Sequence, residues 1–264
     1  MTQADTKKSG VRKSESFESP HASRLTPHAA LVIFAKAPIP GQVKTRLCPP
    51  LTPDEAATLH GTFVIDTLER TRTAATRFGL PLDRYLACSP SSTLAFFKIM
   101  EERHAVRLLD QEGEDLGARM HHVCDTLFGH GYRRVVIVGS DVPTLPLDRY
   151  QQALELLDRF DVALGPAFDG GYYLIGLRTA APELFHDIPW STDRVLPLTK
   201  AKAAALGLTI GELLQWRDVD TLDDLNTLIE ASRLDARKPK REQSFSTRTA
   251  GTLQLLGTRL RSRT

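Results

Sequence analysis

The sequence predicts an α/β domain with a mainly parallel sheet that helices cover on both faces. Short apolar runs rich in β-branched residues alternate along the chain with longer segments that carry helix signals. Two parallel strands need a crossover between them, and that crossover is usually a helix. The 264 residues, 41% hydrophobic and 25% charged, are enough for one large core and exclude a chain that is disordered throughout.

The expected strands are short buried runs, the clearest of them at residues 135–138. The stretch 165–176 suggests some antiparallel pairing, because residues 172–177 look like the return of the run before them. In chain order, the expected strands are 31–35, 85–88, 106–109, 135–138, 162–165, 172–177 and 213–219.

The expected helices begin with residues 52–76, where the start signals are strongest. Thr52 can cap the helix, Pro53 suits its first turn, and Glu55 completes a capping box. The other expected helices are 92–103, 115–128, 147–159, 193–206 and 222–229.

The net charge of +2 is the sum of segments whose charges differ in sign. Residues 29–230, the expected folded domain, carry −7, whereas residues 231–264 carry +7. We expect the latter to be a basic, poorly structured tail, and residues 1–28 to be a disordered leader. An acidic body argues against nucleic acid as the main partner. It suits a protein that concentrates carboxylates around a metal.

Cysteine content and hydropathy indicate in which cellular compartment the protein is expected. Three cysteines without metal-type spacing exclude a disulfide scaffold and favour a reducing, cytoplasmic environment. No apolar run reaches the roughly 18 residues of a membrane span, and the N-terminus lacks a signal-peptide pattern.

A loop of prolines and cations follows the first expected strand, at residues 36–47. It brings Lys36, Lys44 and Arg46 together, and Gly41 permits close approach of backbone to a ligand. Arginine forks and lysine point charges suit a di- or triphosphate. The loop is neither a Walker A motif nor a dinucleotide-binding glycine motif, and a plain basic surface loop is the alternative.

Two further segments fall at strand ends, where open α/β sheets bind ligands. Asp141 follows the strand at 135–138 and can hold Mg²⁺ or Mn²⁺, although a turn aspartate is the alternative. Asp169, Gly170 and Gly171 can orient an acceptor, or form only a tight turn.

Two polar segments near the C-terminus complete the set. In residues 190–193, Ser191 or Thr192 can contact a ligand or merely cap the next helix. In residues 218–221, Asp220 can supply a second metal carboxylate.

Together these segments resemble a known family. Residues 34–47 are similar to the opening signature of a bacterial family of GT-A-like transferases described as radical-SAM- or selenodomain-associated, some of arsenosugar-biosynthesis type. Residues 115–120, 139–143, 165–173, 190–193 and 218–221 match it in the same order. The resemblance implies the nucleotide-diphospho-sugar transferase fold, and the phospholactate guanylyltransferase group looks related.

The resemblance also implies site residues. Lys44, Asp141, Asp169 and Asp193 would be catalytic, and Asp141 would hold the metal with Asp220. The nucleotide would lie on a larger set, namely Ala35, Lys36, Pro40, Gly41, Lys44, Arg46, Gln111, Gly117, Arg119, Gly170 and Gly171.

The expected function is metal-dependent transfer from a nucleotide-activated donor to a small-molecule acceptor. A nucleotide-sugar glycosyltransferase is the first reading. However, many GT-A glycosyltransferases carry Asp-x-Asp where this chain has Gly139 and Asp141. That departure keeps open a nucleotidyltransferase that uses an NTP and releases pyrophosphate. A non-catalytic nucleotide-binding module, or an adaptor that binds anionic surfaces through its basic tail, are the other readings.

Overall fold

The computed structural model describes residues 29–262, which form one seven-stranded sheet in the order β3-β2-β1-β4-β6-β5-β7. β6 is antiparallel to β4 and β5, and all other pairs are parallel. The mainly parallel α/β fold is therefore confirmed. The strands are β1 (Ala29–Lys36), β2 (Leu82–Ser89), β3 (Arg107–Asp110), β4 (Arg134–Gly139), β5 (Val162–Pro166), β6 (Tyr172–Leu177) and β7 (Ile210–Glu212).

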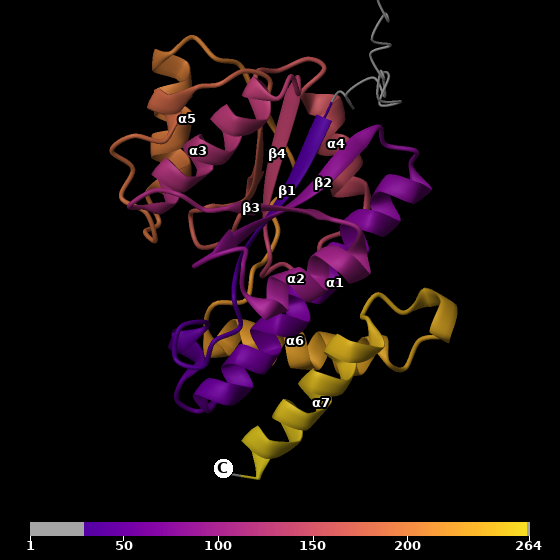
Figure 1. The fold of residues 1–264 in the computed structure, drawn as a ribbon. Helices are drawn as coiled ribbons and strands as arrows, with labels where there is room; N and C mark the ends of the chain where they lie inside the picture. Colours follow the sequence, from indigo (N-terminus) through magenta and orange to yellow (C-terminus); the bar gives the residue numbers. More distant parts are fainter. Residues whose placement is uncertain (1–28, 263–264) are drawn as a thin grey trace, which may run out of the picture.

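Helices cover both faces of the sheet (Figure 1). Side chains alternate along a strand. Leu31 and Ile33 of β1 accordingly join the core beneath α1, α2 and α4, and Val32 joins the core beneath α3 and α5. The helices are α1 (Pro53–Arg77), α2 (Ala95–His104), α3 (Leu116–Gly129), α4 (Asp148–Leu156), α5 (Val195–Ala205), α6 (Leu222–Asp235) and α7 (Thr247–Arg261).

The start of α1 is the one expected. The Thr52 side chain accepts from the Glu55 backbone N–H at 3.2 Å, and the Glu55 carboxylate accepts from the Thr52 N–H at 2.8 Å. This capping box follows the loop at residues 36–47 and thereby holds that loop between β1 and α1.

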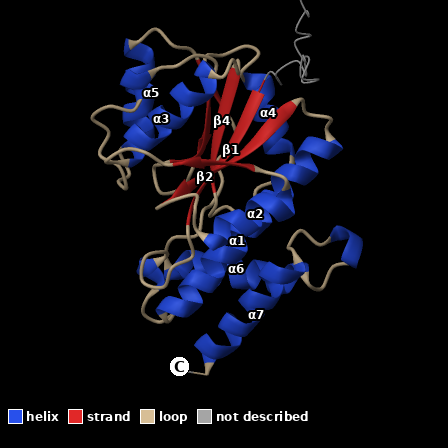
Figure 2. Cartoon of the chain, viewed as in Figure 1, coloured by secondary structure: helices blue, strands red, loops and turns tan. Residues whose placement is uncertain are grey.

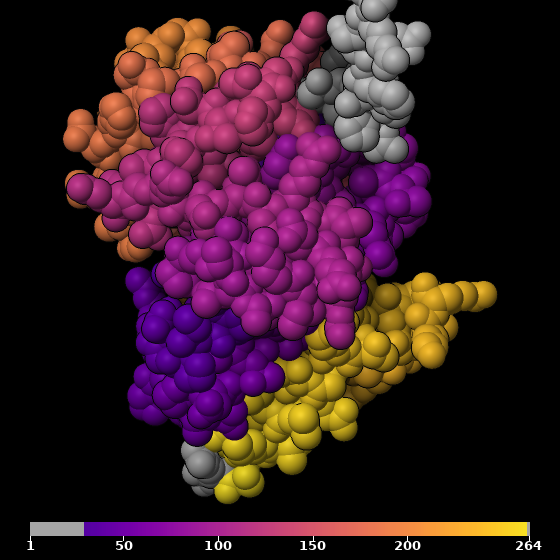
Figure 3. Space-filling view, viewed as in Figure 1, coloured from indigo at the N-terminus to yellow at the C-terminus, as the bar shows by residue number. Residues whose placement is uncertain are grey.

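A third core lies below the sheet, where α6 and α7 pack against the first half of α1 (Figure 2). Leu253 and Leu256 of α7 contribute to it, together with Phe63 of α1 and Leu47 of the short helix η1 (Thr45–Leu47). In Figure 3 the yellow C-terminal segment forms a continuous surface with the indigo segment near residue 50.

The prediction of a poorly structured tail at residues 231–264 is therefore wrong for residues 231–262. A buried carboxylate explains the order: Asp66 of α1, 4% exposed, accepts from Ser246, Arg248 and Thr249. Ser246 caps α7 by accepting from the Thr249 N–H at 3.0 Å. The basic composition of the segment gave no sign of this helix, because the carboxylate that it contacts lies about 180 residues earlier in the sequence.

One expected strand also differs from the structure. The last strand is residues 210–212 rather than 213–219. The chain leaves the sheet after it and returns only as a single bridge from Trp216 to Ala167. The predicted leader, residues 1–28, lies outside the described residues. Among the helices described, none has the length and apolar character that a membrane crossing requires.

The hydrogen bonds between Asp66 and α7 are expected to contribute measurably to the free energy of unfolding. Asp66→Asn should lower the free energy of unfolding by about 1–3 kcal/mol, because buried donors lose their charged acceptor. Glu69→Gln is the matched control: Glu69 pairs with the same Arg248 at 3.1 Å but is exposed, so we expect a loss below about 1 kcal/mol. Urea unfolding checks both. Equal losses would show that Asp66 does not hold α7.

Candidate active site

The candidate site lies at the carboxyl ends of β1, β4 and β5. Lys44 follows β1, Asp141 follows β4, and Asp169 follows β5. A fourth segment, residues 218–220, reaches the same edge because the Val219 N–H donates to the Asp141 carbonyl at 3.1 Å. Segments far apart in sequence thus meet where α/β folds bind ligands.

Lys44 is the centre of this arrangement. Its ammonium donates to Asp141 Oδ2 at 3.1 Å and to Asp220 Oδ1 at 2.7 Å, and its side chain is 6% exposed. The residue has a left-handed backbone (φ 48°) as it enters η1. Arg46, two residues on, approaches Asp220 Oδ2 to 3.9 Å and stays exposed. One cation therefore links two strand-end carboxylates, and a second points outward beside them.

The charges of this cluster stabilise one another. Burial by itself would lower the pKa of Lys44, but the charges of Asp141 and Asp220 hold that pKa above its ordinary value. Burial likewise opposes ionisation of Asp141, yet Lys44 keeps the pKa of Asp141 below its usual range. An ammonium ion and a carboxylate are the forms present at neutral pH.

Three carboxylates form a second group around the same point. Oxygen atoms of Asp169, Asp218 and Asp220 all lie within 4.8 Å of one another. Burial and the negative charges of Asp141, Asp169 and Asp220 raise the pKa of Asp218 to about 7. Crowded carboxylates of this kind fit a divalent cation, which prefers oxygen ligands and offsets their repulsion.

Gly139 stands where an Asp-x-Asp motif has its first aspartate. A Cβ built at Gly139 would lie 2.9 Å from Asp141 Oδ1, within van der Waals radii. A side chain at position 139 would thus require the Asp141 carboxylate to shift slightly. The site supplies its further carboxylates from residues 169, 218 and 220 instead.

His60 is a neighbour that sequence reasoning missed. It is 6% exposed, and its Nε2 donates to the Lys36 carbonyl at 3.0 Å. Burial lowers its pKa, so the ring is neutral. His60 fixes the end of β1, from which the loop departs. Its place on an apolar helix face offered no sequence signal for this contact.

The loop that carries Asp169 packs on the segment at 190–193. Asp169 Oδ1 accepts from the Gly171 N–H at 2.8 Å, and the Gly170 carbonyl accepts from the Leu196 N–H at 2.8 Å. Asp193 is exposed, and its backbone rather than its carboxylate meets Gly170. A catalytic role for Asp193 stays a prediction.

Three of the residues expected to bind the nucleotide make contacts within the protein. Gln111 Nε2 donates to the Ala35 carbonyl at 3.2 Å and to the Ala87 carbonyl at 2.8 Å, which joins three strand ends. Arg119 Nε donates to the Gly113 carbonyl at 3.0 Å. Gly117 is packed against Phe185 and Trp190, where a Cβ would lie 2.6 Å from the Phe185 carbonyl oxygen. Each therefore has a structural role of its own.

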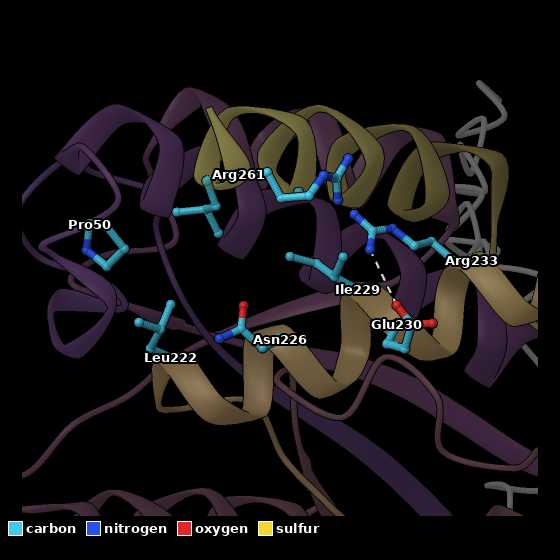
Figure 4. Close-up of a pocket in the computed structure, with 9 residues that line it drawn as sticks. Pro50, Leu222, Asn226, Ile229, Glu230, Arg233 and Arg261 are labelled. Atoms are coloured by element: carbon cyan, nitrogen blue, oxygen red, sulfur yellow. Dashed lines mark hydrogen bonds and ion pairs between the residues drawn. The ribbon is translucent and has the colours of Figure 1, made fainter. Parts of the chain in front are cut away.

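Other predicted ligand residues are simply exposed. Lys36, Pro40 and Gly41 lie on the surface of the loop before Lys44, and Gly41 has the left-handed φ of 79°. Nucleotide binding by these residues stays a prediction. A hollow of about 560 Å³ between α6, α7 and Pro50 contains none of the site carboxylates (Figure 4).

Comparisons with known proteins match this fold. A crystal structure of a "putative nucleotide-diphospho-sugar transferase" from Desulfovibrio desulfuricans G20 is 35% identical, covers 90% of this chain and 98% of its own, and superposes with a TM-score of 0.76. A cytidylyltransferase from Leptospira borgpetersenii shares the fold at 14% identity, with a TM-score of 0.50 over 89% of this chain and 95% of its own. The fold is thus that of nucleotide-diphospho-sugar transferases.

The chain belongs to the family described as "Uncharacterized protein conserved in bacteria (DUF2064)", whose profile matches residues 73–192. A curated relative, 2-phospho-L-lactate guanylyltransferase from Methanothermobacter thermautotrophicus, is 26% identical over 196 residues, which are 70% of this chain and 78% of the relative. The matched family region contains Asp141 and Asp169 but neither Lys44 nor Asp220.

The packing of Gly170 predicts a site-specific cost. Gly170 and Gly131 have the same φ of 88°, but a Cβ at Gly170 would lie 2.4 Å from the Asp193 carbonyl oxygen, whereas one at Gly131 meets nothing within 4 Å. Gly131→Ala should cost about 1–2 kcal/mol from backbone conformation alone. Gly170→Ala should cost about 1–3 kcal/mol more, because backbone must move. Urea unfolding measures both, and equal costs would contradict the Gly170–Asp193 contact.

Proposed function

We propose that the protein is a metal-dependent transferase that uses a nucleotide-activated donor, and that its reaction is nucleotidyl transfer from an NTP to a phosphorylated small molecule. The observation that carries the proposal is the Lys44 ammonium held between Asp141 and Asp220, beside the carboxylates of Asp169 and Asp218. Such a cluster of opposite charges at the ligand-binding edge of the sheet supports phosphate chemistry.

The phosphates of the donor would bind at the loop at residues 36–47. Lys44 offers a point charge, and Arg46 is exposed beside it with a planar fork of donors. Against a body that carries −7, this pair of cations is a local exception that a generally basic surface does not explain. The charges would stabilise a departing phosphate group.

Asp141, Asp169, Asp218 and Asp220 would hold Mg²⁺ or Mn²⁺, since all four offer oxygen ligands at one edge of the sheet. A bound divalent cation supplies a Lewis acid that neutralises phosphate charge. Lys44 shares two of these carboxylates and would turn to the phosphates when the donor binds.

In the proposed step, a phosphate oxygen of the acceptor attacks the α-phosphorus of the NTP. The new bond is the phosphoanhydride between acceptor and nucleotide. The bond from the α-phosphorus to the bridging oxygen breaks, and its electron pair leaves with pyrophosphate. Lys44 and Arg46 would balance the charge that grows on this leaving group.

Two features favour nucleotidyl over glycosyl transfer. Gly139 stands where an Asp-x-Asp motif would have its first carboxylate. The curated relative is a guanylyltransferase. Glycosyl transfer is the second candidate, because the structure that is 35% identical is described as a nucleotide-diphospho-sugar transferase. If the protein transfers glycosyl groups, it would fit the radical-SAM-associated, arsenosugar-type branch that its motifs resemble.

Product analysis tests the choice. The protein is incubated with Mg²⁺ and each of the four NTPs, or with UDP- or GDP-sugars, and with phosphorylated acceptors. We expect pyrophosphate from an NTP. Release of a nucleoside diphosphate from a sugar nucleotide would instead support glycosyl transfer, and failure of every nucleotide to bind would overturn both reactions.

Removal of the central cation should abolish most of this activity. Lys44→Met is expected to lower kcat/KM by roughly 10²–10³-fold, a size typical of lost charge stabilisation of the transition state. Lys98→Met is the control, because Lys98 is exposed on α2 and, within residues 29–262, forms its ion pair with Glu101 at 3.1 Å. A Lys44→Met enzyme as active as the Lys98→Met enzyme would contradict the assignment.

A further inference from the structure

We propose that Phe168 and Arg217 form the acceptor subsite. The acceptor would be a small molecule whose acid group binds the Arg217 guanidinium and whose apolar part packs against the Phe168 ring. The proposal rests on the proposed function and names the class of its second substrate. Phe168 directly precedes Asp169, and Arg217 directly precedes Asp218. The pair therefore borders the carboxylate cluster on both of its chain segments.

The contact between the two side chains joins two loops that are distant in sequence. The Arg217 guanidinium lies 5.0 Å from the centroid of the Phe168 ring. In the described part of the chain, two of the other three such contacts join sequence neighbours, Arg77 with Phe78 and Arg159 with Phe160. Arg217 and Phe168 are 49 positions apart and come from different loops. Tertiary structure, rather than sequence proximity, builds this pair.

The backbone on both sides of the pair is fixed. Ala167 forms a bridge with Trp216, and the Trp216 N–H donates to the Pro166 carbonyl at 3.0 Å. Gln215 Nε2 donates to the Ala167 carbonyl at 3.0 Å. The two loops are thus held together immediately before Phe168 and Arg217, and the pair needs little ordering when a ligand binds.

The guanidinium is anchored and yet open. Arg217 Nη1 donates to Asp224 Oδ1 at 2.9 Å, and Asp224 Oδ2 belongs to the capping box of α6. The Arg217 side chain is still 49% exposed, and a guanidinium has five N–H donors. Donors therefore stay available for a carboxylate or phosphate, which a guanidinium fork binds well.

Phe168 is the apolar part of the subsite. It is 57% exposed, although a large apolar side chain gains by burial. Contact with a ligand body would cover the ring beside the cation. A carboxylate-bearing acceptor entering between Asp169 and Asp218 needs such a cation, since its own charge is otherwise repelled.

Calorimetric binding of two matched acids tests the subsite. The probes are 2-phospho-L-lactate and ethyl phosphate, which differ only in the carboxylate, added to protein loaded with Mg²⁺ and an α,β-methylene NTP. We expect wild type to bind 2-phospho-L-lactate more tightly. Arg217→Gln should raise the Kd of 2-phospho-L-lactate roughly ten- to hundredfold and change that of ethyl phosphate by less than about twofold.

Two further variants separate the roles. Phe168→Leu should weaken both probes, because both carry an apolar body. Arg159→Gln removes a guanidinium stacked on Phe160 at 5.5 Å, away from the site, and should change neither Kd. The comparison of two probes within one variant cancels any loss of folded protein.

The outcomes distinguish this inference from the proposed function. Wild type that binds an NTP analogue but fails to prefer 2-phospho-L-lactate overturns the subsite and leaves nucleotide transfer standing. An unchanged preference in Arg217→Gln does the same. Protein that binds no NTP analogue overturns the proposed function, and the subsite falls with it.

Discussion

The ion pairs of Lys44 with Asp141 and Asp220 join three parts of the chain that would otherwise be independent. Lys44 belongs to the loop after β1, Asp141 to the turn after β4, and Asp220 to the segment that enters α6. Four carboxylates at one edge of a sheet repel one another, and burial together with this repulsion raises the pKa of Asp218. A buried ammonium ion offsets part of it. The protein's own charges therefore hold the candidate site together. A phosphate ligand would have to share the Lys44 ammonium with Asp141 and Asp220.

The C-terminal segment supports this assembly from below. Arg259 of α7 donates to the Pro50 carbonyl at 3.2 Å and forms an ion pair with Glu55 at 2.5 Å. Leu256 packs in the same core as Leu47, one residue after Arg46. The positive charge of residues 231–264 thus partly serves to hold α7 beneath the loop at residues 36–47. Its composition suggested an appendage, but its contacts are those of a structural element.

Sequence alone predicted what local patterns encode. The capping box at Thr52, the strand at 135–138 and the gathering of Lys44, Asp141 and Asp169 at strand ends follow from spacing and residue type, and the structure contains them. It could not predict contacts that depend on tertiary distance. Asp66 became the anchor of α7, and Asp218 joined the carboxylates, because folding brings remote segments together. The close packing of the Asp193 backbone on Gly170 is another contact of this kind.

Equilibrium binding of Mn²⁺, followed by electron paramagnetic resonance, tests the carboxylate cluster most directly. Wild type should bind Mn²⁺ more tightly when a nucleotide is present, and Asp220→Asn should weaken that binding by at least about tenfold, since a ligand is lost. Asp223→Asn is the matched control, because Asp223 is exposed three residues further along, on α6. Equal Mn²⁺ binding by the Asp220→Asn and Asp223→Asn proteins would contradict a metal site on these carboxylates.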